Sequence, residues 1–261
     1  MPQAAILQHK DYEAASVFLP ENLLREARRQ KNLAECSVPA ICVLDPDGDL
    51  ADYLIGQGMA KKNPCWACYH SRLYNFESGG IRIGIVPCIV GASYAVLVAE
   101  QLFVSGCEFL ISVTSAGIID EPEQAKRFAL ITEAIRDEGT SYHYLSADRP
   151  AKISETLLHD LSAAEAPPWF HAKSWTTDAP YRETTRAIQA MKAAGVMCVE
   201  MEAAALYAFA QAKEKQVVCF AHLTNTMAQQ EGDFEKGEHF GSIDTLHLIQ
   251  QVIQWKTPAW A

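Results

Sequence analysis

The sequence is short of basic residues, and it has no hydrophobic run long enough to span a membrane. Its 32 acidic and 22 basic residues give a formal net charge of −10. A surface with that balance repels an extended phosphate backbone, so we expect no nucleic-acid partner, although a local site can still hold one anion. No stretch of about 18 apolar residues occurs, and the first 20 residues lack a basic segment followed by an apolar run. We therefore predict a cytoplasmic protein without a membrane partner.

A second ligand pair for a structural zinc site is also missing. Cys65 and Cys68 stand three residues apart, with His70 two residues further on, but no comparable pair follows. The chain is also longer than the small secreted domains that disulfides hold together. We therefore interpret the cysteines as reduced core thiols and expect no metal, with a redox or metal role for the Cys65 and Cys68 pair as the alternative. The remaining cysteines, spread through apolar segments, are Cys36, Cys42, Cys88, Cys107, Cys198 and Cys219.

Internal repeats, low-complexity tracts and flexible linkers are absent as well. With 261 residues, of which 49% are hydrophobic, the chain can bury the core of one α/β domain. Residues 1–40 contain a helix-period stretch at 21–31 and then Pro39, and we interpret them as an N-terminal helical arm before a domain of residues 41–261. Beyond the arm, short β-branched runs alternate with helix-period segments, which is typical of a twisted, mainly parallel or mixed sheet flanked by helices. These segments are residues 81–86, 92–105, 109–113, 128–135, 182–194, 202–213, 217–223 and 243–255.

The residues after each predicted strand are the candidates for a site, because ligands bind beyond the carboxyl ends of the strands in such a sheet. The first candidate is Val199-Glu200-Met201-Glu202, which precedes a small, apolar helical stretch. Two carboxylates in an apolar stretch are costly to bury unless they are hydrogen bonded, and the vicinal hydroxyls of a sugar are suitable partners. The alternative is that both glutamates only supply negative charge to the start of an ordinary helix.

Three further strand ends carry polar or aromatic side chains. Residues 112–117 (SVTSAG) can bring backbone N–H groups and hydroxyls close to a small anion or a sugar. The loop 138–144 (EGTSYHY) presents the rings and imidazole of a nucleobase pocket, although such rings can equally pack a loop onto the core. Asn225 ends another predicted strand, before Gln229-Gln230-Glu231. Its amide can donate and accept hydrogen bonds to a ligand, or else cap a turn.

These four segments resemble the nucleoside phosphorylase superfamily, and GVMCVEMEAAAL with the later Asn225 and QQE is most similar to the uridine phosphorylase branch. The similarity extends from about Asp45 to the C-terminus and includes WTTDAPYRET at residues 175–184. The resemblance implies an α/β fold with a central twisted sheet that cleaves the bond between a nucleobase and its ribose. It also implies a homo-oligomer, from dimer to hexamer, with active sites near the subunit contacts. A small-molecule nucleoside is the implied ligand, with no cofactor and with inorganic phosphate as a possible co-substrate.

The resemblance implies roles for individual residues. Glu202 holds the ribose hydroxyls and Met201 packs on the sugar, so that Glu202 stabilises the oxocarbenium-like ribose as the C1′–N bond stretches. Glu200 is assigned to the ribose as well. Asn225 is the second catalytic candidate and favours a pyrimidine or an oxo-purine, because family members that act on adenine compounds tend to carry an aspartic acid there. The base-binding candidates are Gly139, Ser141, His143, Tyr144 and Arg182.

Both arginines with which the family's phosphorylases bind phosphate are missing. The glycine-Asp-Pro-x-Arg motif of the family aligns with residues 44–48, where Gly48 replaces the arginine, and Ser112 stands where the second arginine is expected. Losing two guanidinium groups should weaken phosphate binding by roughly several kcal/mol unless other cations replace them. The acidic run 45–49 lacks the ligand spacing of an EF-hand, so we expect a turn there rather than a calcium site. The phosphate or nucleophile candidates are Ser93, Ser112, Ser115 and Gly48, and the candidate replacement cations are Arg72, His70, Arg149, Arg25, Arg28 and Arg29.

Three functions stay open at this point. The first is phosphorolysis of a ribonucleoside, and the second is hydrolysis by a nucleosidase that uses water. The third is a non-catalytic nucleoside-binding protein that keeps Glu202 and Met201 without turnover. The identity of the sugar product separates the first two, whereas saturable nucleoside binding without release of base would select the third.

Overall fold

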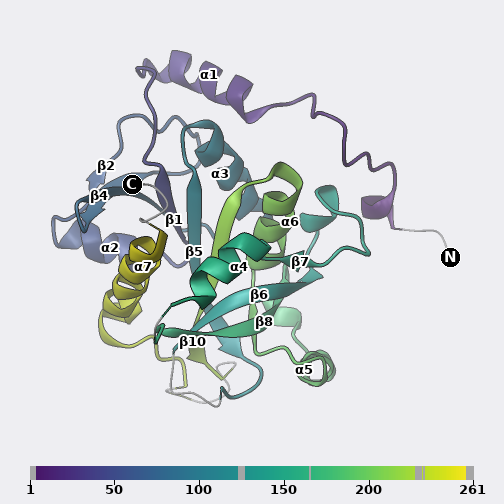
Figure 1. Ribbon diagram of the computed structural model, residues 1–261. Coiled ribbons are helices and arrows are strands. Elements are labelled where there is room, and N and C mark those ends of the chain that lie inside the picture. The colour runs from purple at the N-terminus through teal and green to yellow at the C-terminus, as the bar shows by residue number, and fades with distance from the viewer. Residues whose placement is uncertain (1–3, 123–126, 165, 227–230, 232, 257–261) are drawn as a thin grey trace.

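The strands of the protein form one mixed sheet in a computed structural model that describes residues 4–122, 127–164, 166–226, 231 and 233–256 (Figure 1). In space the strands follow the order β10-β6-β8-β9-β5-β1-β4-β3-β2, with β7 beside β6. Their bounds are β1 Ile41–Asp45, β2 Lys61–Lys62, β3 Tyr74–Ser78, β4 Ile81–Pro87, β5 Phe109–Ile118, β6 Phe128–Asp137, β7 Ala151–Lys152, β8 Trp169–Thr177, β9 Cys198–Glu200 and β10 Gln216–Asn225.

One part of this sheet closes on itself. β10 pairs in parallel with β5 and antiparallel with β6, while β6, β8, β9 and β5 are joined in that order. These five strands therefore form a ring, and closure of a sheet removes its free edges. β1 pairs in parallel with both β5 and β4, and β3 and β2 continue the sheet antiparallel. The predicted mixed sheet is confirmed.

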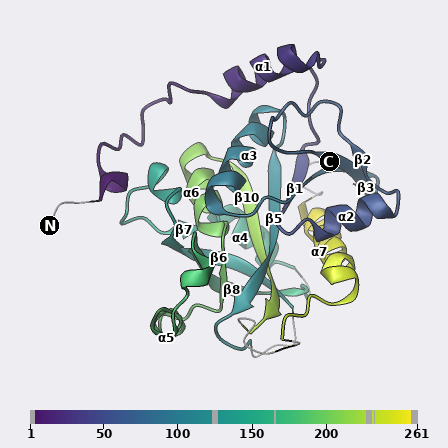
Figure 2. The same ribbon diagram turned by 180° about the vertical axis from the view of Figure 1, so that it is seen from behind.

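Helices cover both faces of the sheet, as predicted. α3 packs against α6 on one side, and α2 and α4 both contact α7 on the other (Figures 1 and 2). The α-helices are α1 Pro20–Lys31, α2 Asp49–Gly56, α3 Ala92–Val104, α4 Glu155–Ser162, α5 Thr185–Ala193, α6 Ala203–Lys213 and α7 Ser242–Lys256. Short 3₁₀ turns are η1 Ala5–Leu7, η2 Ser141–His143, η3 Pro180–Arg182 and η4 Glu238–Gly241.

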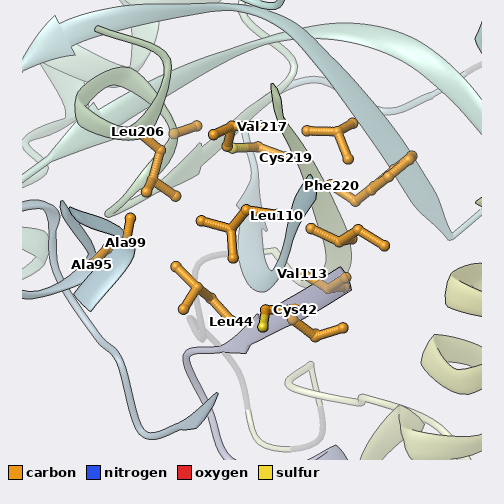
Figure 3. Close-up of a cluster of buried hydrophobic side chains, with 14 of the residues drawn as sticks. Cys42, Leu44, Ala95, Ala99, Leu110, Val113, Leu206, Val217, Cys219 and Phe220 are labelled. Carbon is orange, nitrogen blue, oxygen red and sulfur yellow. The ribbon is translucent and has the colours of Figure 1, made fainter. Parts of the chain in front are cut away.

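The core lies between the central strands and the α3 and α6 pair. Residues 203–210 of α6 are all buried, so this helix is apolar on every side and its alanines allow close approach to the sheet. Figure 3 shows the side chains of β1, β5 and β10 meeting those of the two helices. The residues labelled there are Cys42, Leu44, Leu110, Val113, Val217, Cys219, Phe220, Ala95, Ala99 and Leu206.

One predicted helix starts later than its periodicity indicated. The pattern predicted a helix from residue 182, but α5 begins at Thr185, because the side chain of Thr184 caps it by accepting the N–H of Ala187 at 3.3 Å. Pro180–Arg182 forms the separate turn η3 instead. β8 was not predicted as a strand, because WFHAKSWTT mixes polar and apolar residues without alternation.

The N-terminal segment runs along the outside of the domain and is docked on it by α1 (Figure 1). Leu24 and Ala27 of α1 are buried against Ala67. At the end of the helix, Lys31 Nζ donates hydrogen bonds to the carbonyl oxygens of Ala67 (2.7 Å) and Cys68 (2.6 Å). The helical character of this segment follows the expectation, and the division into residues 1–40 and 41–261 stays a prediction.

The expectation of reduced core thiols is wrong for Cys36 and Cys65, which form a disulfide with Cα atoms 5.3 Å apart. The disulfide joins the segment after α1 to the loop that α1 covers, a pairing between residues too distant in sequence for the spacing to reveal. Cys88 is also not a core thiol, since it is exposed. The buried free thiols are Cys42, Cys68, Cys107, Cys198 and Cys219. In the part of the chain that the structure describes, no group of three or more His, Cys, Asp or Glu could hold a metal, and no helix is long and apolar enough to cross a bilayer.

Replacing Cys36 with serine is expected to lower the Tm of the protein under oxidising conditions. The disulfide closes a loop between residues 29 apart in sequence, and such cross-links commonly stabilise by about 2–4 kcal/mol by restricting the unfolded chain. Thermal unfolding with and without dithiothreitol measures the effect, and reductant should remove the difference from the wild type. Cys88→Ser deletes an exposed free thiol and is the matched control. Equal Tm values for Cys36→Ser and Cys88→Ser would contradict the stabilisation.

Candidate active site

Glu202 lies inside the molecule where β9 ends and α6 begins. Its side chain is buried, and its Oε1 accepts a hydrogen bond from the backbone N–H of Gly91, just before α3, at 2.6 Å. The second oxygen, Oε2, is also buried and has no hydrogen-bond partner among the described residues. A buried carboxylate oxygen without a partner is costly, and a ligand hydroxyl would satisfy it.

The surroundings of Glu202 favour its neutral form in the absence of a ligand. Burial raises the pKa of Glu202 to about 8, and the nearby Glu200 carboxylate adds to this increase, whereas the Gly91 N–H and the nearby hydroxyl of Thr114 oppose it. The charge of Asp47 also contributes to the increase, which places Asp47 within electrostatic reach of Glu202. A carboxyl with so high a pKa in a buried position is a candidate for a functional group.

Glu200 has a different position, and the ribose contact expected for it does not fit. Its Oε1 accepts the hydroxyls of Ser174 (3.0 Å) and Thr176, and its Oε2 accepts the backbone N–H groups of Glu202 and Ala203, both at 2.7 Å. The carboxylate thus ties β8 to the first turn of α6 and has its acceptor positions occupied. Glu200 therefore positions Glu202, while Met201 between them is half-buried.

Asp47 was not predicted as a site residue, yet it lies in the loop between β1 and α2 and contacts Ser115 within β5, which continues to Ile118 instead of turning after residue 113. Its Oδ1 accepts the hydroxyl of Ser115 (3.1 Å), and its Oδ2 accepts the backbone N–H of Ser115 (3.3 Å). Lys236 Nζ completes the contacts at 3.2 Å from Asp47 Oδ2 and 2.5 Å from Asp49 Oδ2. The predicted position of Ser115 beside an anion is therefore occupied by a carboxylate of the chain itself.

A small cavity of about 20 Å³ lies at this cluster. His222 of β10 pairs with Ser115 in the sheet and faces the cavity from a buried position. Burial and the charge of Arg127 lower the pKa of His222 to about 4, so its imidazole is neutral at neutral pH. The cavity is lined by Asp45, Asp47, Asp49, Leu50, Val113, Thr114, Ser115, His222, Lys236, Phe240, Ser242 and Thr245.

The other phosphate-site candidates do not line this cavity. Ser93 is exposed in the first turn of α3, two residues after Gly91. Ser112 is buried within the sheet, where it pairs with Leu44 and Cys219, and its hydroxyl does not reach the cavity lining. Ser112 thus occupies an interior position of β5, and its role in the nucleophile site stays a prediction.

Gly48 is required by the turn rather than by a ligand. It adopts φ 86° immediately before α2, and a Cβ added there would lie 2.9 Å from Sγ of Cys88. Its N–H and that of Ala51 donate to the buried carboxyl of Asp45 at 3.2 and 2.9 Å. Burial, with the charge of Asp47, raises the pKa of Asp45 to about 7 against these hydrogen bonds. The acidic run thus forms a turn, as expected.

The cations expected to replace the phosphate arginines do not line the cavity at Asp47. Arg25 and Arg29 contact Glu26 on the exposed side of α1. His70 and Arg72 line a different cavity, of about 720 Å³, beside the loop that α1 covers. None of the six predicted replacement cations lines the cavity at Asp47, where Lys236 takes that place. Lys236 was missed because it lies in a polar segment without a strand or helix signal.

The loop 138–144 is held mainly by its own contacts. The carboxylate of Glu138 accepts the N–H groups of Thr140 (2.6 Å) and Ser141 (2.9 Å), and Arg136 Nε donates to the hydroxyl of Ser141 (2.8 Å). Ser141 is fully buried. The base contact expected for Ser141 is therefore replaced by a structural role.

The packing alternative also applies to Tyr144. Its ring stacks edge-on against Phe209 of α6 with centroids 5.8 Å apart, and its hydroxyl donates to Glu100 at 3.0 Å. Gly139 donates its N–H to Asp178 at 2.8 Å, and His143 Nδ1 lies 2.7 Å from Lys10 Nζ. These four base-binding candidates lie together in one loop, but none lines the cavity at Asp47.

The last two candidates are one residue in a turn after a strand and one residue at the end of a strand. Arg182 is exposed in η3, which follows β8. Asn225 is half-buried at the end of β10, where it pairs with Gly117 and donates from Nδ2 to the hydroxyl of Thr224 at 3.1 Å. Gln229 and Gln230 of the predicted QQE segment lie outside the described residues. The structure thus brings Ser115 and Asp47 together at the cavity, whereas Glu202, Arg182 and the loop 138–144 are not among its lining residues.

The pKa of Glu202 predicts that conformational stability falls as the pH rises. The unfolded chain loses the proton near the ordinary value of 4.5, whereas the folded protein keeps it up to about 8. The contribution is therefore fully present below about pH 4.5 and is lost as the pH rises through 8, because the folded state binds more protons in that window. Urea unfolding between about pH 5 and pH 8 measures the decline. Glu202→Gln cannot ionise and should show a shallower decline, so parallel curves would contradict the assignment.

The fold and the site together define an α/β protein with a buried carboxyl group between a strand and the start of a helix. A profile of the phosphorylase superfamily matches residues 40–246, and the chain belongs to that superfamily. Among curated proteins, it is 26% identical to a guanosine phosphorylase of Halorubrum lacusprofundi over 145 residues. That match covers 54% of this chain, and the chain spans only 60% of the length of that relative.

Solved structures show the same fold. A uridine phosphorylase of Vibrio fischeri ES114, in complex with 6-hydroxy-1-naphthoic acid, is similar with a TM-score of 0.70 at 20% identity, over 86% of this chain and 97% of that one. A purine nucleoside phosphorylase of Toxoplasma gondii, in complex with immucillin-H, has a TM-score of 0.66 at 14% identity, over 83% and 90%. The predicted superfamily and its nucleoside phosphorylase-like fold are confirmed.

Proposed function

We propose that this protein cleaves the N-glycosidic bond of a ribonucleoside. The observation that carries this proposal is Glu202, whose Oε2 is buried without a hydrogen-bond partner among the described residues while Oε1 is fixed by Gly91. Two vicinal ribose hydroxyls would satisfy that oxygen, and their arrival would favour the ionised carboxylate. Superfamily membership supports the same reaction class.

The chemistry follows from the charge that develops on the sugar. As the C1′–N bond stretches, the ribose becomes oxocarbenium-like, so a fixed carboxylate that contacts it stabilises the transition state more than the ground state. Met201 would pack on the sugar, and Asn225 would hold a pyrimidine or an oxo-purine by donating and accepting hydrogen bonds. The names of the relatives, a guanosine and a uridine phosphorylase, are compatible with both kinds of base.

The nucleophile separates two forms of this function. Phosphorolysis agrees with the relatives, whereas hydrolysis agrees with the absence of both phosphate arginines and with Asp47 at Ser115. The test is release of base from uridine, thymidine, inosine, guanosine and adenosine, with and without phosphate, with identification of the sugar. Ribose 1-phosphate formed only with phosphate would support phosphorolysis, and free ribose would support hydrolysis. Absence of release from all five would overturn the proposal in favour of a nucleoside-binding protein.

We also propose that the chain forms a homo-oligomer in the cytoplasm. Val17, Phe18 and Leu19, before α1, form an exposed apolar run, and Val17 is completely accessible. Large exposed apolar side chains that lie together favour a protein contact. Size-exclusion chromatography with light scattering tests the oligomer, and a monomer at all concentrations would contradict it.

A further inference from the structure

Three hydrogen-bond donors from two distant segments converge on the Asp47 carboxylate. The backbone N–H and the hydroxyl of Ser115 come from β5, and the ammonium of Lys236 comes from the segment before η4. A backbone N–H, a hydroxyl and a cation are the groups with which proteins bind a small oxyanion. Ser115 and Lys236 therefore form an anion subsite, which the chain fills with its own side chain.

This subsite lies next to the candidate ribose carboxylate. Thr114, adjacent to Ser115, lines the same cavity, and its hydroxyl lies near the Glu202 carboxyl, whose pKa it lowers. Two carboxylates from different segments thus flank the region where the sugar would bind. An anion seated on Ser115 and Lys236 would be close to the reacting end of a ribose held by Glu202.

The cavity that remains beside Asp47 suits water better than phosphate. Its volume is about 20 Å³. Because one buried water needs at least roughly 10–15 Å³ by the same kind of measure, this volume holds a single water while the partly exposed side chain of Asp47 keeps its place on Ser115. The acid groups of Asp45, Asp47 and Asp49 line this cavity, and Lys236 is the only cationic residue among the described residues that line it. Such surroundings repel a phosphate dianion.

We propose that the Asp47 carboxylate takes the place of inorganic phosphate on Ser115 and Lys236, and that Asp47 thereby selects water as the nucleophile. The inference rests on the proposed cleavage of a nucleoside. A water oxygen forms a bond to C1′ as the C1′–N bond breaks, and the electron pair of that bond leaves with the base. The water gives one proton to Asp47, and the base takes up a proton from solvent. The products are free ribose and the free base.

The first test compares Asp47→Ala with the wild type on the nucleoside that the wild type cleaves best. Wild-type release of base should be independent of phosphate and should yield free ribose. Asp47→Ala should be about 100-fold slower without phosphate, since a general base is worth about that much, and it should gain acceleration by phosphate with ribose 1-phosphate as a product. Asp52→Ala removes an exposed carboxylate of α2 that does not line the cavity, and it should behave as the wild type. Phosphate-independent release by Asp47→Ala at the wild-type rate, or phosphate-dependent release by the wild type, would overturn the inference.

The second test needs no turnover. Thermal unfolding is followed with increasing inorganic phosphate, against potassium chloride at equal ionic strength, because a ligand that binds the folded state raises Tm. Asp47→Ala should be stabilised by phosphate, whereas the wild type and Asp52→Ala should not. Equal stabilisation of all three proteins, or of none, would overturn the role of Asp47 in excluding phosphate. If no nucleoside is cleaved, the proposed function fails by itself, because phosphate binding is measured separately.

Discussion

Replacing Glu202 with glutamine is expected to reduce kcat/KM for base release by about 100- to 1000-fold, the usual loss when one preorganised electrostatic contact to a transition state is removed. Glutamine has nearly the same shape and can still accept the N–H of Gly91 through its side-chain oxygen. It lacks the negative charge that favours an oxocarbenium-like ribose over the neutral substrate. The lower kcat/KM should therefore come from a lower kcat as well as from a higher KM.

The same variant should fold normally. The buried carboxyl of Glu202 is already mostly neutral at neutral pH, because its pKa is raised to about 8, so the amide introduces no new buried charge. Circular dichroism and thermal unfolding check this, and Glu77→Gln on the exposed side of β3 is the control for a glutamate on the surface. Base release by Glu202→Gln at the parental rate would show that the ribose site has been assigned to the wrong residue.

Replacing Glu200 with alanine is expected to destabilise the fold by about 3–5 kcal/mol, because removal of one partner from a buried polar network leaves the others without hydrogen bonds. Four donors lose their acceptor at once: the hydroxyls of Ser174 and Thr176 and the N–H groups of Glu202 and Ala203. For a chain of this size, roughly 2–4 °C of Tm is lost per kcal/mol. A decrease of more than about 6 °C should therefore be observed.

Glu200→Gln distinguishes hydrogen bonding from charge at this position. Its amide oxygen can accept the two backbone N–H groups, and its amide nitrogen can donate to the hydroxyls of Ser174 and Thr176, which can turn to accept. Burial raises the pKa of Glu200 against these hydrogen bonds, so loss of the charge itself should cost little. We expect Glu200→Gln to unfold within a few degrees of the wild type. A decrease equal to that of the alanine variant would show that the charge, rather than the network, stabilises this junction.

Glu200 and Glu202 show what the local sequence predicts and what it does not. Their spacing predicted two buried carboxylates at the start of α6, and both are buried. The pattern could not distinguish the two, because the difference lies in their partners. Ser174 and Thr176 of β8 occupy one carboxylate, while Gly91, before α3, contacts the other. These partners come from other elements, so the sequence of residues 199–202 could not predict them.

For the loop 138–144 and the acidic turn at residues 45–49, too, the local sequence did not predict contacts with distant parts of the chain. Aromatic residues after a strand are compatible with a base pocket or with core packing, and the contact of Tyr144 with Phe209 on α6 supports packing. Asp47 was predicted only as part of a turn, because its contacts, Ser115 and Lys236, come from other parts of the chain. Cys36 and Cys65 were likewise interpreted as separate thiols, although the docking of α1 brings them together.

Alternation of β-branched and helix-period segments was sufficient to predict the α/β class, the flanking helices and the position of Glu202, because burial of apolar side chains along one element follows a period of two or 3.6 residues. Which polar groups meet depends on how distant elements pair. The closed ring of β5, β10, β6, β8 and β9 aligns His222 with Ser115, and the β1–α2 turn places Asp47 on Ser115. Hydrogen bonds and ion pairs require atoms to be only a few ångströms apart, a condition that strand register and helix docking impose and that a linear pattern does not contain.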